Sequence, residues 1–552
     1  MKDNTNIPAP ITPSPLGEGW DGVKLKINNQ SVSVEAGTTI LKAAQKLGIE
    51  IPTMCHNDEV EHFTSCMICL VKNTQNGKLY PSCSLQVHEG MEIITFDDEI
   101  REARQTGLEL LLSDHVGDCE APCTIACPAH MDIPTMNRLL AAGKFDEAVR
   151  VVKQNIALPS VLGHICPAPC EGACRRKPID GAVSICLLKR FSGNEGKYEE
   201  KPAPLTGNKV AIVGSGPAGL SAAYYLQMKG IQAVIFDKAP IAGGLMRTDI
   251  EDEKLPKDVL DREIEVIEKI GVQFKLNTEI GKNEFDRFQK EFDAVILASG
   301  IITEEQKTWG ITASEKGFEA DGNTYLTNLP NVFAVGNALR SSKLAIRSLA
   351  QGKEAAAAVW QMLNGKPVVG QPLKFNSKFG KLVIPEYAQY LKESVDGNRI
   401  EPVNGNLTGM TAEEVIAEAA RCMHCDCRKI DSCKLREYSD QYGAVQKRFA
   451  YEERKAVRKY FTQGTTQALT QSESLSSESL NNGIVYEPEK CIKCGICVRL
   501  TAKHQEKYGF TYIGRGFDVE IGVPFNETLN EGLKLIAEKV ADECPTGALG
   551  RK

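Results

Sequence analysis

The sequence predicts a multidomain protein of the α/β and α+β classes. Its 552 residues exceed what one hydrophobic core usually holds, so several domains are expected. An apolar run leads into a glycine-rich turn and a helix in VAIVGSGPAGL, which predicts a Rossmann-like domain around 210–220. The 19 cysteines fall into four groups along the chain, which indicates several metal-binding regions.

Composition excludes some partners and locations. The formal charge of −7 gives no electrostatic reason to expect nucleic acid as a partner. No apolar run approaches the roughly 18 residues that span a bilayer, and residues 1–22 predict a disordered, Pro-rich tail. We therefore expect a cytoplasmic protein without membrane insertion, whose cysteines bind metal rather than form structural disulfides.

Residues 23–105 predict a β-grasp ferredoxin-like domain with a 2Fe-2S cluster. Alternating residues around an Asn-Asn turn indicate a hairpin in VKLKINNQSVSVE, and a helix is predicted after it in TTILKAAQKLGI. The pattern resembles the start of the large iron–sulfur subunit of complex I and of iron-only hydrogenases, with structural zinc as the alternative. The four thiolates that would hold the two irons are Cys55, Cys66, Cys69 and Cys83.

Residues 106–200 predict a helical domain with two 4Fe-4S clusters. Amphipathic spacing in IPTMNRLLAAGKFDEAVRVV separates two close cysteine sets. The pieces ACP and CPAPCEGAC resemble the amino-terminal domain of the glutamate synthase small subunit and of dihydropyrimidine dehydrogenase. That resemblance implies one cluster at His115, Cys119, Cys123 and Cys174, and another at Cys127, Cys166, Cys170 and Cys186.

Two of these ligands depart from the family pattern. His115 stands where the family would supply a cysteine, and its alternative is an ordinary surface histidine. Cys186 completes the second cluster, where relatives use Glu or Gln a few residues later. Lys189 occupies that later position and cannot ligate iron while it is protonated.

Residues 201–368 predict an FAD-binding domain that begins with a strand, a glycine turn and a helix. Gly214 permits the tight turn, Gly216 lets the backbone approach a pyrophosphate, and Gly219 lets helix and strand pack closely. The pyrophosphate would lie on the helix N-terminus, where free N–H groups and the helix dipole favour negative charge. Asp237 ends the second strand and can accept hydrogen bonds from a ribose.

Later segments of this domain resemble the flavin domain of the glutamate synthase small subunit. Gly244 and Leu245 lie in a segment that runs past the flavin in that family, and Gly336 and Asn337 lie in its second FAD motif. The family usually has Asp where this chain has Asn337. About 30 residues separate Gly300 from the returning strand, without a second glycine turn. We therefore expect no nicotinamide domain and no direct NAD(P)H oxidation by this chain.

Residues 369–462 predict an extension with its own cysteine site. The preceding helix, in AEEVIAEAARCMHC, resembles the helix that introduces a cluster cysteine in the glutamate synthase family. A 4Fe-4S cluster, a zinc ion and redox-active thiols are the alternatives, with His424 outside the ligand set. The cysteines are Cys422, Cys425, Cys427 and Cys433.

Residues 485–552 predict a ferredoxin-like domain with one 4Fe-4S cluster, after a Ser-rich flexible linker at 463–484. A CxxCxxC run and a distant Cys-Pro wrap a single cubane, and zinc is the alternative. The segment resembles part of complex I's large subunit and of formate dehydrogenases. Its ligands are Cys491, Cys494, Cys497 and Cys544.

These sites together predict an electron-transferring iron–sulfur flavoprotein subunit of a soluble multi-subunit oxidoreductase. The partner subunits would belong to a hydrogenase, a formate dehydrogenase-like enzyme or an NADH-linked complex, and ferredoxin is a further candidate. One alternative is a self-contained FAD-dependent oxidoreductase that acts on ferredoxin or a small substrate. A second is a scaffold with a degenerate flavin site. The main hypothesis predicts about 18 irons and one FAD per chain.

Overall fold

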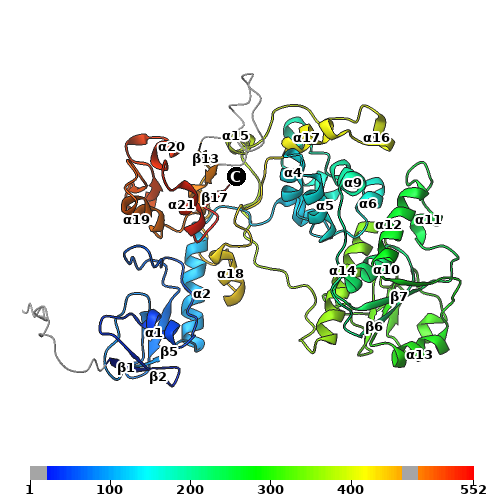
Figure 1. The fold of residues 1–552 in the computed structure, drawn as a ribbon, viewed down its shortest axis with the longest axis horizontal. Coiled ribbons are helices and arrows are strands. Elements are labelled where there is room, and N and C mark those ends of the chain that lie inside the picture. Colours follow the sequence, from blue (N-terminus) through cyan, green and yellow to red (C-terminus); the bar gives the residue numbers. More distant parts are fainter. Residues whose placement is uncertain (1–21, 463–482, 552) are drawn as a thin grey trace, which may run out of the picture.

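The computed structural model describes residues 22–462 and 483–551, and these form two lobes (Figure 1). One lobe combines the N-terminal sheet with the C-terminal ferredoxin-like part, and the other combines a helical domain with a parallel sheet. Residues 369–462 run between the lobes. The predicted tail at 1–22 and linker at 463–484 lie almost entirely outside the described residues. Within the described ranges, no helix is long and apolar enough to cross a membrane.

The N-terminal part is the predicted β-grasp, a five-stranded sheet in the order β2-β1-β5-β3-β4. Asn28 and Asn29 both have positive φ, which suits the tight turn between β1 and β2. Thr39 caps α1, because its hydroxyl accepts from Lys42 N at 3.3 Å. The elements are β1 (Val23–Ile27), β2 (Gln30–Val34), α1 (Ile40–Lys46), β3 (Leu70–Asn73), β4 (Lys78–Pro81) and β5 (Glu92–Ile94).

Helix α2 (Asp98–Ser113) leads from this sheet into the predicted helical domain. Two of its short helices end just before a cysteine. Cys127 follows α3 and Cys166 follows α6, and both cysteines have extended backbone geometry. The helices are α3 (Pro122–Ala126), α4 (Ile133–Ala141), α5 (Phe145–Lys153), α6 (Pro159–Ile165), α7 (Pro169–Gly172), α8 (Lys177–Asp180) and α9 (Ile185–Glu195).

The Rossmann-like part is a five-stranded parallel sheet in the order β12-β9-β6-β7-β8, with α10 (Pro217–Met228) and α14 (Ala345–Leu363) packed together beside it. A small hairpin, β10 (Ala313–Ser314) and β11 (Gly317–Phe318), lies in the chain between β9 and β12. The strands are β6 (Lys209–Val213), β7 (Gln232–Phe236), β8 (Gln273–Lys275), β9 (Ala294–Leu297) and β12 (Val332–Ala334).

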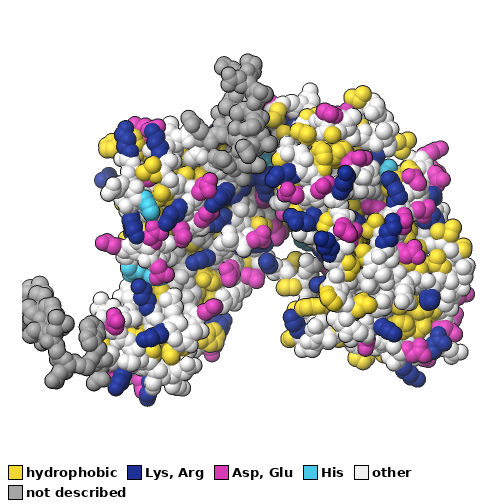
Figure 2. Space-filling model, in the orientation of Figure 1, with side chains coloured by type: hydrophobic (Ala, Val, Ile, Leu, Met, Phe, Trp, Pro, Cys, Tyr) yellow, Lys and Arg dark blue, Asp and Glu magenta, His cyan; other side chains and the backbone are white. Residues whose placement is uncertain are grey.

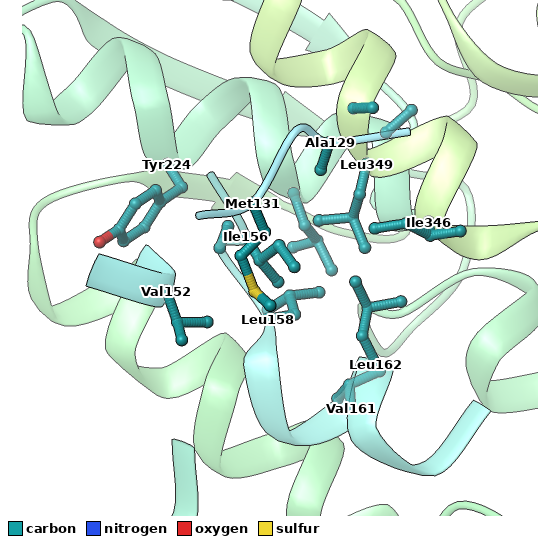
Figure 3. Close-up of a cluster of buried hydrophobic side chains, with 14 of the residues drawn as sticks. Ala129, Met131, Val152, Ile156, Leu158, Val161, Leu162, Tyr224, Ile346 and Leu349 are labelled. Carbon is teal, nitrogen blue, oxygen red and sulfur yellow. The ribbon is translucent and has the colours of Figure 1, made fainter. Parts of the chain in front are cut away.

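The parallel-sheet part and the helical domain share one hydrophobic core. Figure 3 shows Ile156 and Leu158 of the helical domain beside Ile346 and Leu349 of α14, and all four side chains are buried. Burial of apolar surface between domains holds them in one relative position. Whatever binds to the glycine turn therefore has a fixed position relative to the cysteines of the helical domain.

The extension does not form a domain of its own, because its elements pack on both lobes. Helix α17 (Ala412–Ala420) packs on α4, and α18 (Lys434–Tyr442) packs on α2. Strand β13 (Tyr460–Phe461) joins β14 (Ile484–Tyr486) and β17 (Leu549–Arg551) in one sheet, so the C-terminal part includes residues before the predicted linker. Other helices of the extension and the C-terminal part are α15 (Ile384–Leu391), α16 (Gly405–Thr408), α19 (Ile496–Lys503) and α21 (Ala537–Glu543), and the Rossmann-like part also contains α12 (Lys257–Lys269) and α13 (Lys282–Glu291).

Candidate functional site

The cysteines of the β-grasp part converge as predicted, and we name this set group A (Cys55, Cys66, Cys69 and Cys83). Cys69 Sγ lies 2.9 Å from Cys83 Sγ, and Cys55 contacts both Cys66 and Cys83. The hydrogen bond with Cys83 lowers the pKa of Cys69 to about 7. All four thiols are buried, so the set suits a cluster that needs thiolate ligands shielded from water.

The predicted C-terminal set also converges, and we name it group B (Cys491, Cys494, Cys497 and Cys544). These residues line one cavity with about 360 Å³ of empty space. Gly495 adopts a φ of 70°, which turns the chain between the second and third cysteines. Cys544 follows directly after α21, so the helix end brings it to the loop. Burial raises the pKa of Cys491 to about 12.

Two central sets differ from the predicted grouping. Cys119 does not lie with Cys123, because Cys427 N donates to Cys119 O at 3.0 Å and draws it to the extension. We name this set group C (Cys119, Cys427 and Cys433, with His115 as a candidate fourth member). The side chain of Cys119 interacts with those of Cys427 and Cys433, and burial raises the pKa of Cys119 to about 12.

His115 lies beside Lys490, the residue that connects groups B and C, rather than on open surface. Its side chain is half-buried, its Nδ1 is shielded from solvent, and that nitrogen has no hydrogen-bond partner. An unpartnered buried ring nitrogen is costly, and a metal ion would satisfy it. Burial lowers the pKa of His115 to about 4, which keeps the imidazole in the neutral form that metals bind. Its role as a ligand stays a prediction.

The other two cysteines of the extension enter the helical domain, in group D (Cys123, Cys174, Cys422 and Cys425). The four residues line one cavity with about 370 Å³ of empty space, nearly the size of the cavity in group B. The four predicted ligands at 422–433 therefore do not form one site, and the structure corrects that prediction. A closed zinc site at those four cysteines does not fit this geometry.

The last set is the one predicted from the resemblance, group E (Cys127, Cys166, Cys170 and Cys186). Cys186 lies within hydrogen-bond reach of both Cys166 and Cys170. Cys127 belongs to the same set, since the Lys189 ammonium interacts with all four thiols. Cys186 therefore lies beside the other cysteines of group E, and its role as a fourth ligand stays a prediction.

Buried ion pairs hold the extension where its cysteines reach groups C and D. Glu418 and Arg421 pair at 2.7 Å with side chains at most 2 % exposed, and Glu418 also accepts from Ser184 N at 2.8 Å. On the other side of Cys425, Asp426 forms two hydrogen bonds with Arg138 of α4, at 3.0 and 2.5 Å. Arg138 and Asp426 are not predicted from the sequence, although an acid between two cysteines is a signal of a buried partner.

The five groups are neighbours in the order A, B, C, D and E. Groups A and B meet where the thiols of Cys55 and Cys494 interact, and Asn57 Nδ2 donates to Glu543 Oε2 at 2.7 Å nearby. Lys490 connects B to C, since it precedes Cys491 and interacts with the Cys427 thiol. Groups C and D are adjacent because Cys427 of group C and Cys425 of group D are separated only by Asp426.

Groups D and E meet along α3. Cys127 N donates to Cys123 O at 3.2 Å, so one helical turn carries a cysteine of each group. Beyond group E, Lys353 of α14 donates to Ala129 O at 3.1 Å and to Asn155 Oδ1 at 2.8 Å. This buried lysine ties the Rossmann-like part to the segment directly after Cys127.

Within the described ranges, no three His, Cys, Asp or Glu side chains converge closely enough to hold a single metal ion. A cubane is larger than one ion, and each of its irons takes one cysteine ligand. Ligands of a cubane therefore do not need to converge on one point.

The glycine turn has the geometry that a dinucleotide site requires. Gly214 has a φ of 107°, and a Cβ on Gly219 would overlap Gly214 O. A Cβ on Gly216 would meet nothing within 4 Å, so this position faces open space at the start of α10. No side chain caps that helix, and its N–H groups are left for an anion.

The remaining predicted nucleotide residues surround this turn. Asp237 accepts from Ser215 N at 2.7 Å and so holds the turn itself, and its contact with a ribose stays a prediction. Gly244 packs against Gly216 and precedes the half-exposed Leu245. Asn337 Oδ1 accepts from Ser342 N at 2.9 Å, and Gly336 N donates to Gln351 Oε1 at 2.8 Å.

Four family models match separate parts of the chain. They are described as a 2Fe-2S iron-sulfur cluster binding domain at 21–97 and a dihydropyrimidine dehydrogenase domain II with a 4Fe-4S cluster at 113–201. The others are an NAD(P)-binding Rossmann-like domain at 212–273 and a ferredoxin-like domain of NADH-quinone oxidoreductase subunit 3 at 482–550. The chain is built from iron–sulfur and Rossmann-like domains.

Similar proteins include subunits of several oxidoreductases. The beta subunit of the NADPH-Fe(3+) oxidoreductase of Geobacter sulfurreducens is 39% identical over 36% of this chain and 30% of its own length. The beta subunit of the NADP(+)-dependent formate dehydrogenase of Moorella thermoacetica is 37% identical over 36% and 32%. The glutamate synthase [NADPH] small chain of Escherichia coli is 38% identical over 37% and 45%. The matched region spans less than half of each relative.

Proposed function

We propose that this chain is an electron-transferring iron–sulfur flavoprotein subunit of a larger oxidoreductase. The observation that carries the proposal is the single-file order of groups A to E, which ends beside the Rossmann-like part. Group A has the ligand set for a 2Fe-2S cluster, and groups B to E have ligand sets for 4Fe-4S clusters, with His115 completing group C.

The chain's own residues do two things for this relay. They fix the spacing between sites, since Lys490, Asp426 and α3 each join two neighbouring groups. They also exclude water, because the thiols of all five groups are buried or half-buried. The surroundings of a rigid site that excludes water rearrange little when the site gains or loses an electron.

FAD is the nucleotide that fits the Rossmann-like part in this proposal, and it exchanges electrons in pairs or singly when bound. Gly216 leaves space for the pyrophosphate, and the uncapped start of α10 offers N–H groups to it. Gly244 and Asn337 would line the path toward the flavin. The matching family model is described as NAD(P)-binding, so the cofactor must be identified by extraction.

The partners of this subunit would carry the substrate chemistry. A hydrogenase, a formate dehydrogenase-like enzyme or an NADH-oxidising flavin subunit could each dock near groups A and B. The two beta subunits that resemble this chain belong to oxidoreductases whose names contain NADPH or NADP(+), and this supports a place in such an assembly. We propose a cytoplasmic location.

The test is anaerobic analysis of iron, sulfide, zinc and flavin on one preparation, followed by reduction experiments. We expect about 18 irons and one FAD per chain, and no zinc. The chain alone should be reduced by dithionite but only slowly by NADH or NADPH. Rapid bleaching of the clusters by either nicotinamide nucleotide without a partner would overturn the proposal.

A self-contained oxidoreductase is the second candidate, and one cavity favours it. An open cavity of about 520 Å³ has Cys186 in its wall, together with Arg190 and Lys254. A small substrate or carrier protein could approach group E there. Purification of the native protein separates the two candidates: a stoichiometric complex supports the first, and a lone active chain supports the second.

A further inference from the structure

Lys189 is a buried cation in contact with group E. It lies on α9, one helical turn after Cys186, and its side chain is almost completely enclosed, with 3% of the residue exposed. Its Nζ lies 3.8 Å from Cys186 Sγ and 3.3 Å from Leu162 O, to which it donates a hydrogen bond. The chain therefore points an ammonium group at the four thiols.

The charge of Lys189 has no acidic partner in the part of the chain that the structure describes. Among residues 22–462 and 483–551, Lys189 forms no ion pair with an Asp or Glu, and its interactions are with thiols and a carbonyl. Two cations that interact with thiols of groups C and D differ in this respect. Lys490 pairs with Glu487 at 2.6 Å, and Arg175 pairs with Asp118 at 2.6 Å.

The position of Lys189 determines where its charge acts. A lysine side chain is a cation at neutral pH, and this one is held between Cys186 Sγ and Leu162 O and is shielded from water. It is therefore placed to pair with the negative charge of the site that the four cysteines hold.

We propose that Lys189 raises the reduction potential of the cluster held by group E, so that this site accepts electrons more readily than groups C and D. This inference rests on the proposed function, because it assumes a cluster at group E. Reduction adds one negative charge to the site, and an uncompensated cation at this distance in a buried environment stabilises that charge. A hydrogen bond to Cys186 Sγ acts in the same direction.

The electron balance is simple. One electron leaves a neighbouring reduced site, which is oxidised, and reduces group E. No bond forms or breaks in this step. Because Lys490 and Arg175 are each neutralised by an acid, they contribute less at groups C and D.

The test uses the full-length protein with its clusters in place. Lys189→Met removes the charge and keeps an apolar side chain of similar length, while Lys189→Arg keeps the charge. The midpoint potential of each cluster is measured by an anaerobic redox titration followed by electron paramagnetic resonance. The signal that disappears in Cys166→Ser identifies the cluster of group E.

We expect Lys189→Met to shift the electron-transfer equilibrium of group E at least tenfold toward the oxidised state, which is about 59 mV for one electron. Lys189→Arg should stay within threefold of the unmodified protein. Lys153→Met is the matched control, because Lys153 is also buried in the helical domain but pairs with Glu200. It should leave the potential of group E unchanged.

Iron content distinguishes failure of the proposed function from failure of the role proposed for Lys189. If Cys166→Ser loses no iron, group E holds no cluster and the proposed function fails. If Lys189→Met keeps all its iron and its midpoint potential is unchanged, only the role of Lys189 is overturned. Lys189→Gln is a second neutral variant in case Lys189→Met does not assemble. If both neutral variants lose the cluster and Lys189→Arg keeps it, the lysine serves assembly rather than potential, and the inference is also overturned.

Discussion

Groups A and B differ from groups C and D in how the chain assembles them. The cysteines of group A come from one segment, 55–83, and three of the four in group B come from one short run, 491–497. Groups C and D join residues separated by about 300 positions, since Cys119 and Cys123 meet cysteines of the extension. A short loop defines its own site, whereas a divided site depends on how distant segments dock.

This difference has a consequence for stability. In groups A and B, hairpins and helix ends position the thiols locally. In groups C and D, the positions depend on buried ion pairs and on one backbone hydrogen bond between Cys427 and Cys119. Variants that test the divided sites should therefore show the larger effects.

The largest effect is expected from two double variants that give opposite results under the two groupings. Cys422→Ser with Cys433→Ser should remove about eight irons, because the residues belong to groups D and C. Cys123→Ser with Cys422→Ser should remove only about four, because both belong to group D. Iron analysis of anaerobically purified protein checks this. A loss of about four irons in the first variant and about eight in the second would restore the sequence-based grouping.

A smaller loss is expected from His115→Ala, which removes the only candidate ligand of group C that is not a cysteine. The variant should lose up to about four irons, because the cluster would keep three protein ligands. His115→Cys should retain them and change the spectrum of one cluster. Iron analysis and electron paramagnetic resonance provide the measurement. Full iron content and an unchanged spectrum in His115→Ala would exclude the histidine as a ligand.

Glu418→Ala should destabilise the docking of the extension by about 3 kcal/mol, because it leaves a buried cation with fewer partners. Arg421 keeps its ion pair with Asp180 at 3.0 Å. The loss of stability is therefore expected at the lower end of the range for breaking a buried ion pair. The rate of iron release from group D in chemical denaturant measures the effect. Glu265→Ala is the control, since its exposed pair with Lys269 contributes below about 1 kcal/mol.

The smallest effects on the fold are expected at the glycine turn, which is local like groups A and B. Gly219→Ala places a Cβ against Gly214 O and should cost about 1–3 kcal/mol of stability. Gly216→Ala meets no protein atom, so thermal unfolding of the flavin-free protein should be unchanged. It should nevertheless lose flavin, measured after acid extraction. Full flavin content in Gly216→Ala would contradict a pyrophosphate at this turn.

The sequence was sufficient wherever spacing is local. It predicted the hairpin at Asn28 and Asn29, the glycine turn, and the convergence of groups A and B. The membership of group E was predicted from the resemblance to the glutamate synthase family rather than from spacing. It did not predict that Cys422 and Cys427 belong to different groups, because four cysteines within twelve positions suit one site equally well by spacing. That division follows from Arg138 and Arg421, whose partners are distant in sequence and invisible to any local pattern.

The division of the extension's cysteines also sets an order for the maturation of the protein. Group A is complete once residue 83 has left the ribosome, so its cofactor can be inserted while synthesis continues. Groups C and D remain open until residues 422–433 have been made and have docked against the helical domain. Under the proposed function, a cell making this chain must therefore keep Cys119, Cys123 and Cys174 reduced through most of translation and supply their iron afterwards.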